Sequence, residues 1–288
     1  MRYPNNLKKT NSCDVFWRLT FASLALAAVI SVVSIKQIEA QDSVPKKTVV
    51  MVHGSFADGS SWEKVIPLLQ ERDLSVIVVQ IPLTSLADDV SVTKRAIDAA
   101  PGEVILVGHS WGGAVITEAG NNDKVRALVY VAAFAPSKNQ SVTDILKDYP
   151  NPEWFSSVNV DSGGFWKLSP EGLGKFFAQD LTAVQTSVMA ATQGPILPSV
   201  FGDKITESAW SNKPSWYIVG ANDRMIGADL EKQMAKKIGA ATFVLESSHV
   251  PMLSKPKEVS NVILAAVGAT KKIFIFGTPY ELGKCRVL

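Results

Sequence analysis

The sequence predicts an α/β fold: a doubly wound, mostly parallel sheet with helices on both faces and a largely helical cap inserted into it. Two observations carry this prediction. Short runs of β-branched and aliphatic residues alternate with amphipathic segments of helical length, which is the pattern of parallel strands buried on both faces. One such run, 104–107, leads into Gly-His-Ser-Trp-Gly at 108–112, which is typical of a sharp turn from a strand into a helix.

The expected elements alternate as strand and helix after a polar linker at 41–47. Apolar runs predict the strands, and segments with helical periodicity predict the helices. Strands are expected at 49–52, 74–81, 104–107, 125–131, 215–219 and 242–245. Helices are expected at 62–71, 88–100, 111–120, 227–237 and 256–267. Because such strands run parallel, their carboxyl ends should share one edge of the sheet.

The alternation stops at Pro136 and resumes at Ser215. Residues 137–212 are irregular and helical in parts, and we expect them to cap the carboxyl ends of the strands, where ligands bind in such sheets. The core domain then comprises 41–136 and 213–270. Aromatic side chains are frequent in the cap, and we expect them to form its own core rather than to contact a substrate: Trp154, Phe155, Phe165, Trp166, Phe176 and Phe177.

The two ends of the chain differ from this core. Residues 1–40 combine basic residues, an apolar run at 19–35 and a small residue at Ala40, which is typical of a secretory signal peptide cut after Ala40. This predicts export to the periplasm or the medium. An uncleaved segment would instead anchor the chain in a membrane, because the apolar run approaches spanning length. The tail at 271–288 has no place in the alternation, and we assign it no role.

Composition narrows the classes of function. The net charge is +2 over 288 residues, without a long run of like charge, so no basic face for nucleic acid is expected. The two cysteines, Cys13 and Cys285, lie in the expected signal segment and in the tail, which leaves the mature chain no intramolecular disulfide. No spacing of His, Cys, Asp and Glu is typical of a metal site. The expected partner is a small molecule, and the oligomeric state stays open.

The turn at 108–112 points to Ser110 as a nucleophile. Side chains two positions before and after a serine in such a turn would collide, and Gly108 and Gly112 have none. The hydroxyl group then projects from the sheet edge beside the free N–H groups at the start of the next helix. We therefore expect Ser110 to attack a carbonyl carbon.

A serine nucleophile needs a base that takes its proton. The chain has three histidines. His249 directly follows a strand and would emerge at the same sheet edge as Ser110. His53 is expected to be a structural histidine beneath the site, and the side chain of His109 is expected to point away from the hydroxyl group of its neighbour. His249 is therefore the expected base.

The base in turn needs a carboxylate that orients it and stabilises its positive charge. Asp223 follows a strand directly, and the chain order Ser110, Asp223, His249 is the order that this architecture uses. Asp223 could instead cap the helix that follows it. Asp229, inside that helix, and Asp203, in the cap, are weaker rivals.

The attacked carbonyl oxygen becomes negatively charged and needs donors that are already aimed at it. The backbone N–H of Trp111, just after the nucleophile, is one expected donor. The second is expected from Ser55, in the loop after the first strand. The side chains of Phe56, Trp111 and Val250 lie next to these positions in the sequence, and we expect them to contact the substrate.

Four motifs in chain order carry a resemblance to a known family. They are Val-His-Gly-Ser-Phe-Ala-Asp-Gly-Ser-Ser-Trp at 52–62, Gly-His-Ser-Trp-Gly-Gly at 108–113, Val-Gly-Ala-Asn-Asp at 219–223 and Ser-His at 248–249. Across residues 48–268 the sequence resembles the α/β-hydrolase superfamily. Its opening motif is similar to that of small serine esterases, which include plant methylesterases, hydroxynitrile lyases and bacterial carboxylesterases, some of them pyrethroid-cleaving.

The resemblance implies a serine carboxylesterase that forms an acyl-enzyme on Ser110 and uses no metal or organic cofactor. The Trp and Phe residues of the apolar cap, with Trp111 beside the nucleophile, favour small, apolar or aromatic esters as substrates. Relatives of this fold that dehalogenate or open epoxides carry an aspartate nucleophile. This chain has Ser110 at that position, so neither activity is expected. Hydroxynitrile lyases carry a lysine after the triad histidine, where this chain has Val250. Haloperoxidase or perhydrolase chemistry without a cofactor, lactone or amide hydrolysis, and a non-catalytic binding protein of this fold all stay open.

Overall fold

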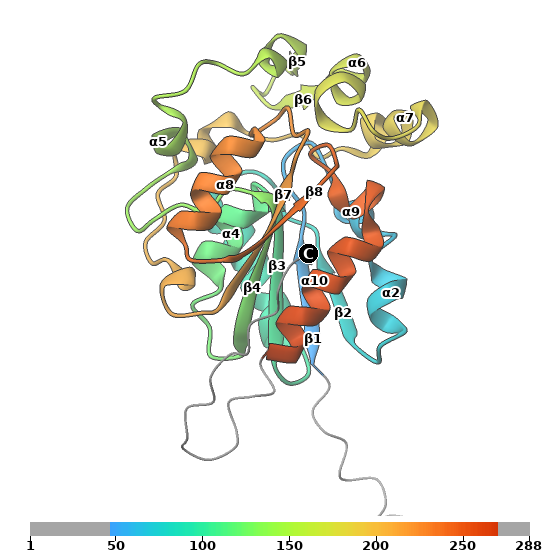
Figure 1. The fold of residues 1–288 in the computed structure, drawn as a ribbon. Helices are drawn as coiled ribbons and strands as arrows, with labels where there is room; N and C mark the ends of the chain where they lie inside the picture. The colour runs from blue at the N-terminus through green and yellow to red at the C-terminus, as the bar shows by residue number, and fades with distance from the viewer. Residues whose placement is uncertain (1–46, 270–288) are drawn as a thin grey trace, which may run out of the picture. The chain divides into compact units, whose positions relative to one another are not determined.

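The computed structural model describes residues 47–269 (Figure 1). The expected signal segment at 1–40 and the tail at 271–288 lie outside the described residues. Within the part that is described, no helix has the length and the apolar character needed to cross a membrane.

A six-stranded sheet forms the centre of the fold. Its strands lie in the order β2-β1-β3-β4-β7-β8, and every neighbouring pair is parallel. The strands are β1 (Thr48–Val52), β2 (Ser75–Val79), β3 (Val104–Ser110), β4 (Val125–Ala133), β7 (Ser215–Gly220) and β8 (Ala241–Leu245). Every residue of β1 and β3 is buried, which explains why these strands read as unbroken apolar runs. All six expected strands are present.

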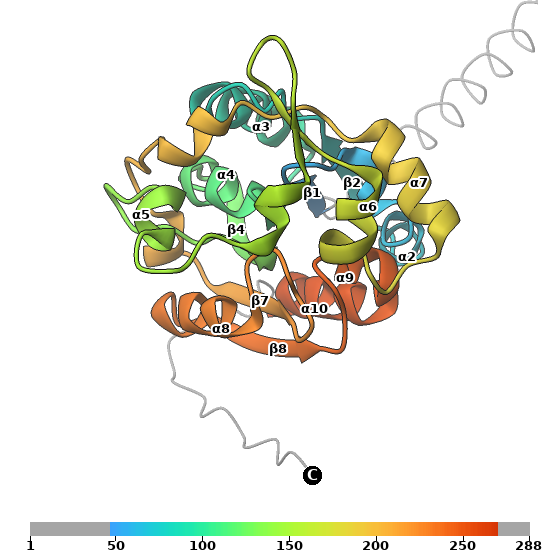
Figure 2. The ribbon, with the colours of Figure 1, turned by 90° about the horizontal axis from the view of Figure 1, so that it is seen from above.

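Helices cover both faces of this sheet (Figure 2). α3 and α4 pack together on one face, α2 and α10 pack together on the other, and α8 packs against β7 and β8. The helices are α2 (Ile66–Gln70), α3 (Leu86–Ala99), α4 (Gly112–Ala119), α8 (Ala228–Lys237), α9 (Pro251–Ser254) and α10 (Pro256–Ala269). The doubly wound α/β fold expected from the sequence is confirmed.

One expected helix differs from the structure. The sequence predicts a continuous helix over 62–71, but the chain forms a 3₁₀ turn, η1 (Gly59–Trp62), and then α2. Pro67 lies in the first turn of α2. Proline has no N–H to donate and its ring clashes with the preceding turn, so it is accommodated at a helix start but not in a helix interior. The helix therefore begins at Ile66.

Short elements fill the segment between β4 and β7. The helical elements are α5 (Val142–Leu146), η2 (Glu153–Ser157), α6 (Pro170–Gly172), η3 (Leu173–Phe177), α7 (Ala183–Thr192), η4 (Pro198–Gly202) and η5 (Ala209–Ser211). An antiparallel pair, β5 (Val158–Val160) and β6 (Trp166–Leu168), joins them. α5, α6, α7 and this pair lie over the carboxyl ends of the central strands (Figure 1). The cap is largely helical as expected, and the strand pair is an addition.

The turn between β3 and α4 is tightly constrained. Ser110 has a φ of 53°, in the left-handed region that residues with a side chain rarely adopt. A Cβ atom on Gly108 would lie 2.5 Å from the carbonyl oxygen of Gly112, and one on Gly112 would lie 2.6 Å from the carbonyl oxygen of His53. The start of α4 thus packs backbone to backbone against β1 and β3, and this contact holds Ser110 at the sheet edge.

The Gly108→Ala variant tests this constraint. The added methyl group would overlap backbone atoms of α4, so the free energy of unfolding should fall by about 1–3 kcal/mol. Gly202→Ala is the matched control, because a Cβ atom there meets no other atom within 4 Å. It should leave the stability unchanged or raise it by up to about 1 kcal/mol. Urea unfolding of both variants measures the difference, and equal stabilities would contradict the packing argument.

Candidate active site

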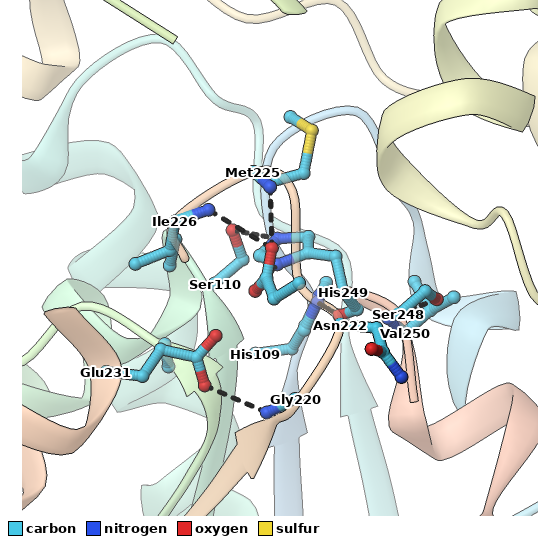
Figure 3. Close-up of polar contacts among 12 residues, drawn as sticks. His109, Ser110, Gly220, Asn222, Met225, Ile226, Glu231, Ser248, His249 and Val250 are labelled. Atoms are coloured by element: carbon cyan, nitrogen blue, oxygen red, sulfur yellow. Dashed lines mark hydrogen bonds and ion pairs between the residues drawn. The ribbon is translucent and has the colours of Figure 1, made fainter. Parts of the chain in front are cut away.

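Three polar side chains from separate loops meet at the carboxyl ends of β3, β7 and β8 (Figure 3). Ser110 Oγ lies 2.8 Å from His249 Nε2, and His249 Nδ1 lies 2.6 Å from Asp223 Oδ2. All three residues are buried. Because Nδ1 faces a carboxylate, it carries the proton, and Nε2 is left to accept the hydrogen bond from the serine hydroxyl. The structure therefore brings together the three residues that the sequence selected.

Asp223 is held as a carboxylate by the donors around it. The backbone N–H groups of Met225 and Ile226 donate to Asp223 Oδ1 at 2.6 and 3.1 Å. Burial opposes ionisation of this carboxyl, but the charge of His249 and the hydrogen bonds hold its pKa well below its usual range. α8 begins at Ala228 with Gly227 before it, so Asp223 binds the loop ahead of the helix rather than the first turn of the helix.

The rival acids lie elsewhere. The side chain of Asp229 is 94% exposed and pairs with Lys232 at 3.3 Å on the surface of α8. Asp203 Oδ2 accepts a hydrogen bond from the backbone N–H of Leu86 at 2.8 Å and ties the cap to the start of α3. Neither carboxyl is bonded to His249.

The other two histidines have structural contacts. His53 Nδ1 donates to a backbone carbonyl of its own loop at 2.9 Å, and the N–H of Ile81 donates to its Nε2 at 3.2 Å. His109 Nε2 donates to the backbone carbonyl of His249 at 2.8 Å. Burial lowers the pKa of His53, and burial together with the charge of His249 lowers the pKa of His109. Both rings are therefore neutral supports of the site, and neither is bonded to Ser110.

The loop after β1 lies against the nucleophile because β1 and β3 are neighbouring strands. The strand order reverses at this point, which is where open α/β sheets bind ligands. A Cβ atom on Gly54 would lie 2.5 Å from the Cβ of Ser110. Within residues 47–269, the backbone N–H groups of Ser55 and Trp111 donate no hydrogen bond, and the buried hydroxyl of Ser55 has no partner. These N–H groups are available to an oxyanion beside Ser110.

The three expected substrate contacts separate in the structure. Phe56 lines the cavity above Ser110. Trp111 does not, because its indole turns away from the cavity, donates from Nε1 to Asp89 Oδ2 at 2.7 Å and packs edge-on against Phe201. Val250 is fully buried and is also absent from the cavity wall. The expectation that Trp111 and Val250 contact the substrate through their side chains is therefore wrong for this geometry.

A cavity of about 870 Å³ opens above Ser110 and is lined mainly by apolar side chains. Five of the six cap aromatic residues named from the sequence reach it: Trp154, Phe155, Trp166, Phe176 and Phe177. The expectation that these residues form the cap core holds for the buried Trp154, Phe176 and Phe177, but these residues line the cavity as well. The cap lies over the strand ends, and the same rings pack in its interior and face the cavity. Their place in an insertion over the strand ends is the sequence signal that could have revealed this.

A π-helical turn places one of these rings on His249. η3 is closed by the hydrogen bond from the N–H of Ala178 to the carbonyl of Leu173 at 2.9 Å, a geometry that recurs at functional sites. The ring of Phe177 packs edge-on against His249 with centroids 4.9 Å apart. The N–H of Ser248 also donates to Asp180 Oδ2 in the cap at 2.8 Å. The cap therefore shields His249 from solvent.

Sequence comparison agrees with this geometry. A model of the alpha/beta hydrolase family matches residues 49–262. The chain belongs to the alpha/beta hydrolase family. Methylesterase 2 of Arabidopsis thaliana is 25% identical over 254 residues, covering 76% of this chain and 95% of that protein. A pyrethroid hydrolase of Sphingobium wenxiniae is 26% identical over 250 residues, covering 75% of this chain and 85% of that protein.

Solved structures of α/β hydrolases share the fold. A crystal structure of a pyrethroid hydrolase superimposes with a TM-score of 0.68 at 21% identity, covering 79% of this chain and 99% of that one. The crystal structure of polyneuridine aldehyde esterase gives a TM-score of 0.67 at 21% identity, covering 77% of this chain and 99% of that one. With relatives that are esterases and other hydrolases, this α/β hydrolase is an enzyme.

The buried Asp89 behind Trp111 gives a pH-dependent stability. Burial raises the pKa of this carboxyl to about 6, although Trp111 and the N–H of Leu83 donate to it. In the unfolded chain it ionises near its ordinary value of 3.8. Between these values only the folded chain keeps the proton, so unfolding releases a proton and rising pH favours it.

Unfolding of the wild type and of Asp89→Asn between pH 4 and pH 7 measures this effect. Relative to the variant, the wild type should lose about 2–3 kcal/mol of unfolding free energy as the pH rises from about 4 to about 6, and no more above that range. A constant difference across the range would show that Asp89 ionises normally in the folded protein.

Proposed function

We propose that this enzyme hydrolyses carboxylic esters through an acyl-enzyme formed on Ser110. The observation that carries the proposal is the unbroken series of hydrogen bonds from Ser110 through His249 to Asp223 at the base of an apolar cavity. The names of the relatives, methylesterase, pyrethroid hydrolase and polyneuridine aldehyde esterase, support an ester as the substrate.

In the first step Ser110 Oγ attacks the ester carbonyl while His249 Nε2 takes the hydroxyl proton. Asp223 stabilises the imidazolium ion that results. The carbonyl oxygen becomes an oxyanion and accepts hydrogen bonds from the backbone N–H groups of Ser55 and Trp111. The protonated His249 then gives its proton to the departing alkoxide, and the alcohol leaves the acyl group on Ser110.

In the second step a water molecule takes the place of the alcohol. His249 accepts a proton from this water as its oxygen attacks the acyl carbon, and the same backbone N–H groups hold the second oxyanion. Collapse of this intermediate breaks the bond to Ser110, and the protonated His249 returns the proton to the serine oxygen. The acid leaves, and the enzyme regains its starting state.

A fluorophosphonate probe tests this proposal. Phosphonylation of Ser110 alone should accompany the loss of p-nitrophenyl acetate hydrolysis, and Ser110→Ala should lower kcat by at least about 10⁴-fold without unfolding the protein. Ser211→Ala, an exposed serine of the cap, is the control and should retain both labelling and activity. Folded protein that takes up no probe and shows no hydrolysis would instead favour a non-catalytic binding protein.

The cavity also supports a preference among esters. Its volume of about 870 Å³ and its aromatic wall suit a bulky apolar acyl or alcohol group and do not restrict the substrate to small esters. Burying such a group should raise kcat/KM by about 10-fold or more for p-nitrophenyl 4-phenylbutyrate relative to p-nitrophenyl acetate. The monosuccinate ester, which carries a charge, is the contrasting substrate. A higher kcat/KM for the monosuccinate ester would overturn the apolar preference.

A further inference from the structure

Glu231 of α8 is a buried acid that the proposed mechanism does not use. It is 0% exposed, whereas Asp229 on the same helix is almost fully exposed. One of its carboxyl oxygens, Oε2, accepts a hydrogen bond from the N–H of Gly220 at 3.1 Å. The other, Oε1, is buried and has no donor among the described residues. Burying a carboxyl oxygen without a donor costs folding free energy. That cost is avoided if the oxygen carries a proton and donates it in a hydrogen bond to an acceptor.

The acceptor for that proton is the carboxylate of the triad. The carboxyls of Glu231 and Asp223 are in hydrogen-bonding contact. Oε2 of Glu231 bonds to Gly220, and the other carboxyl oxygen points upward in the direction of Ser110 (Figure 3). Two carboxyl groups in contact cannot both be ionised at low cost, so they share one proton.

The surroundings decide which carboxyl holds the proton. Asp223 receives hydrogen bonds from His249, Met225 and Ile226, all of which favour its charged form. Glu231 receives one, from Gly220. Burial, and then the charge of Asp223, raise the pKa of Glu231 well above its usual range.

The other ionisable groups that act on Glu231 do not reverse this assignment. Tyr217 of β7 is buried, and burial raises its pKa, so it is neutral. Its hydroxyl donates to the carbonyl of Ala133. Lys232, on α8, lowers the pKa of Glu231 only as the last contribution.

We propose that Glu231 is a positioning residue, a neutral carboxylic acid that donates a hydrogen bond from Oε1 to Asp223 and so holds the carboxylate that orients His249. This inference rests on the proposed function, because it assigns Asp223 its role in the triad. The donor limits how strongly Asp223 attracts the proton of His249, and it fixes the plane of the Asp223 carboxylate.

Three variants separate the effect of the hydrogen-bond donor from the effect of the side-chain shape. Glu231→Gln keeps the shape and carries a permanent N–H donor, so kcat/KM should stay within about 3-fold of the wild type with an unchanged pH profile. Glu231→Met keeps much of the volume without a donor, so kcat should fall by about 10-fold or more with little change in KM. Its acid limb should also move to higher pH by about half a unit, because Asp223 would hold the proton of His249 more strongly. Asp229→Asn is the control with an exposed acid on the same helix.

Infrared spectra of the wild type and the variants provide a readout that does not depend on turnover. At pH 8 the wild type and Asp229→Asn should show the carbonyl stretch of a protonated carboxylic acid, and Glu231→Gln should lack it. The absence of this band in the wild type would overturn the proposal, as would a Glu231→Gln enzyme whose pH profile matches that of Glu231→Met. Failure of Ser110 labelling in the wild type would overturn the proposed function, whereas failure of the infrared test with normal labelling would overturn only the role of Glu231.

Discussion

The site depends on one steric constraint, the absence of side chains where three backbone segments touch. Gly54, Gly108 and Gly112 each lie so close to a neighbouring residue that a Cβ atom would overlap it. Their contacts press the loop after β1 against the turn after β3 and hold Ser110 at a positive φ. Packing of the backbone therefore positions Ser110 and the N–H groups of Ser55 and Trp111 beside it.

The polar groups around this turn form layers that begin at the cavity and end in the core. Ser110 and Asp223 line the cavity, His249 bridges them by hydrogen bonds, and further polar groups support the three from below. His109 bonds to the backbone of His249, and Glu231 lies behind Asp223. A buried charge is tolerated only where it is paired or bonded, and in this arrangement the one carboxylate at the centre is surrounded by donors. These donors hold the carboxylate of Asp223 in place beside His249.

The cap shapes the cavity above these residues and keeps water away from them. Its aromatic rings are shared between the interior of the cap and the cavity wall, and Phe177 covers His249 directly. Excluding water strengthens each electrostatic contact in the site. The same segment therefore forms the wall of the cavity and keeps His249 out of solvent.

The sequence by itself determined the α/β class, the six strands and the turn at Ser110, and it selected the three side chains that meet there, Ser110, Asp223 and His249. These features depend on local patterns: apolar runs, paired glycines and polar residues directly after strands. Only the tertiary structure decided where side chains of neighbouring residues point. It turned Trp111 toward Asp89 and away from the cavity, brought the cap aromatics to the cavity, and set Glu231 against Asp223. These outcomes depend on contacts between segments far apart in the chain, and no spacing within one segment encodes them.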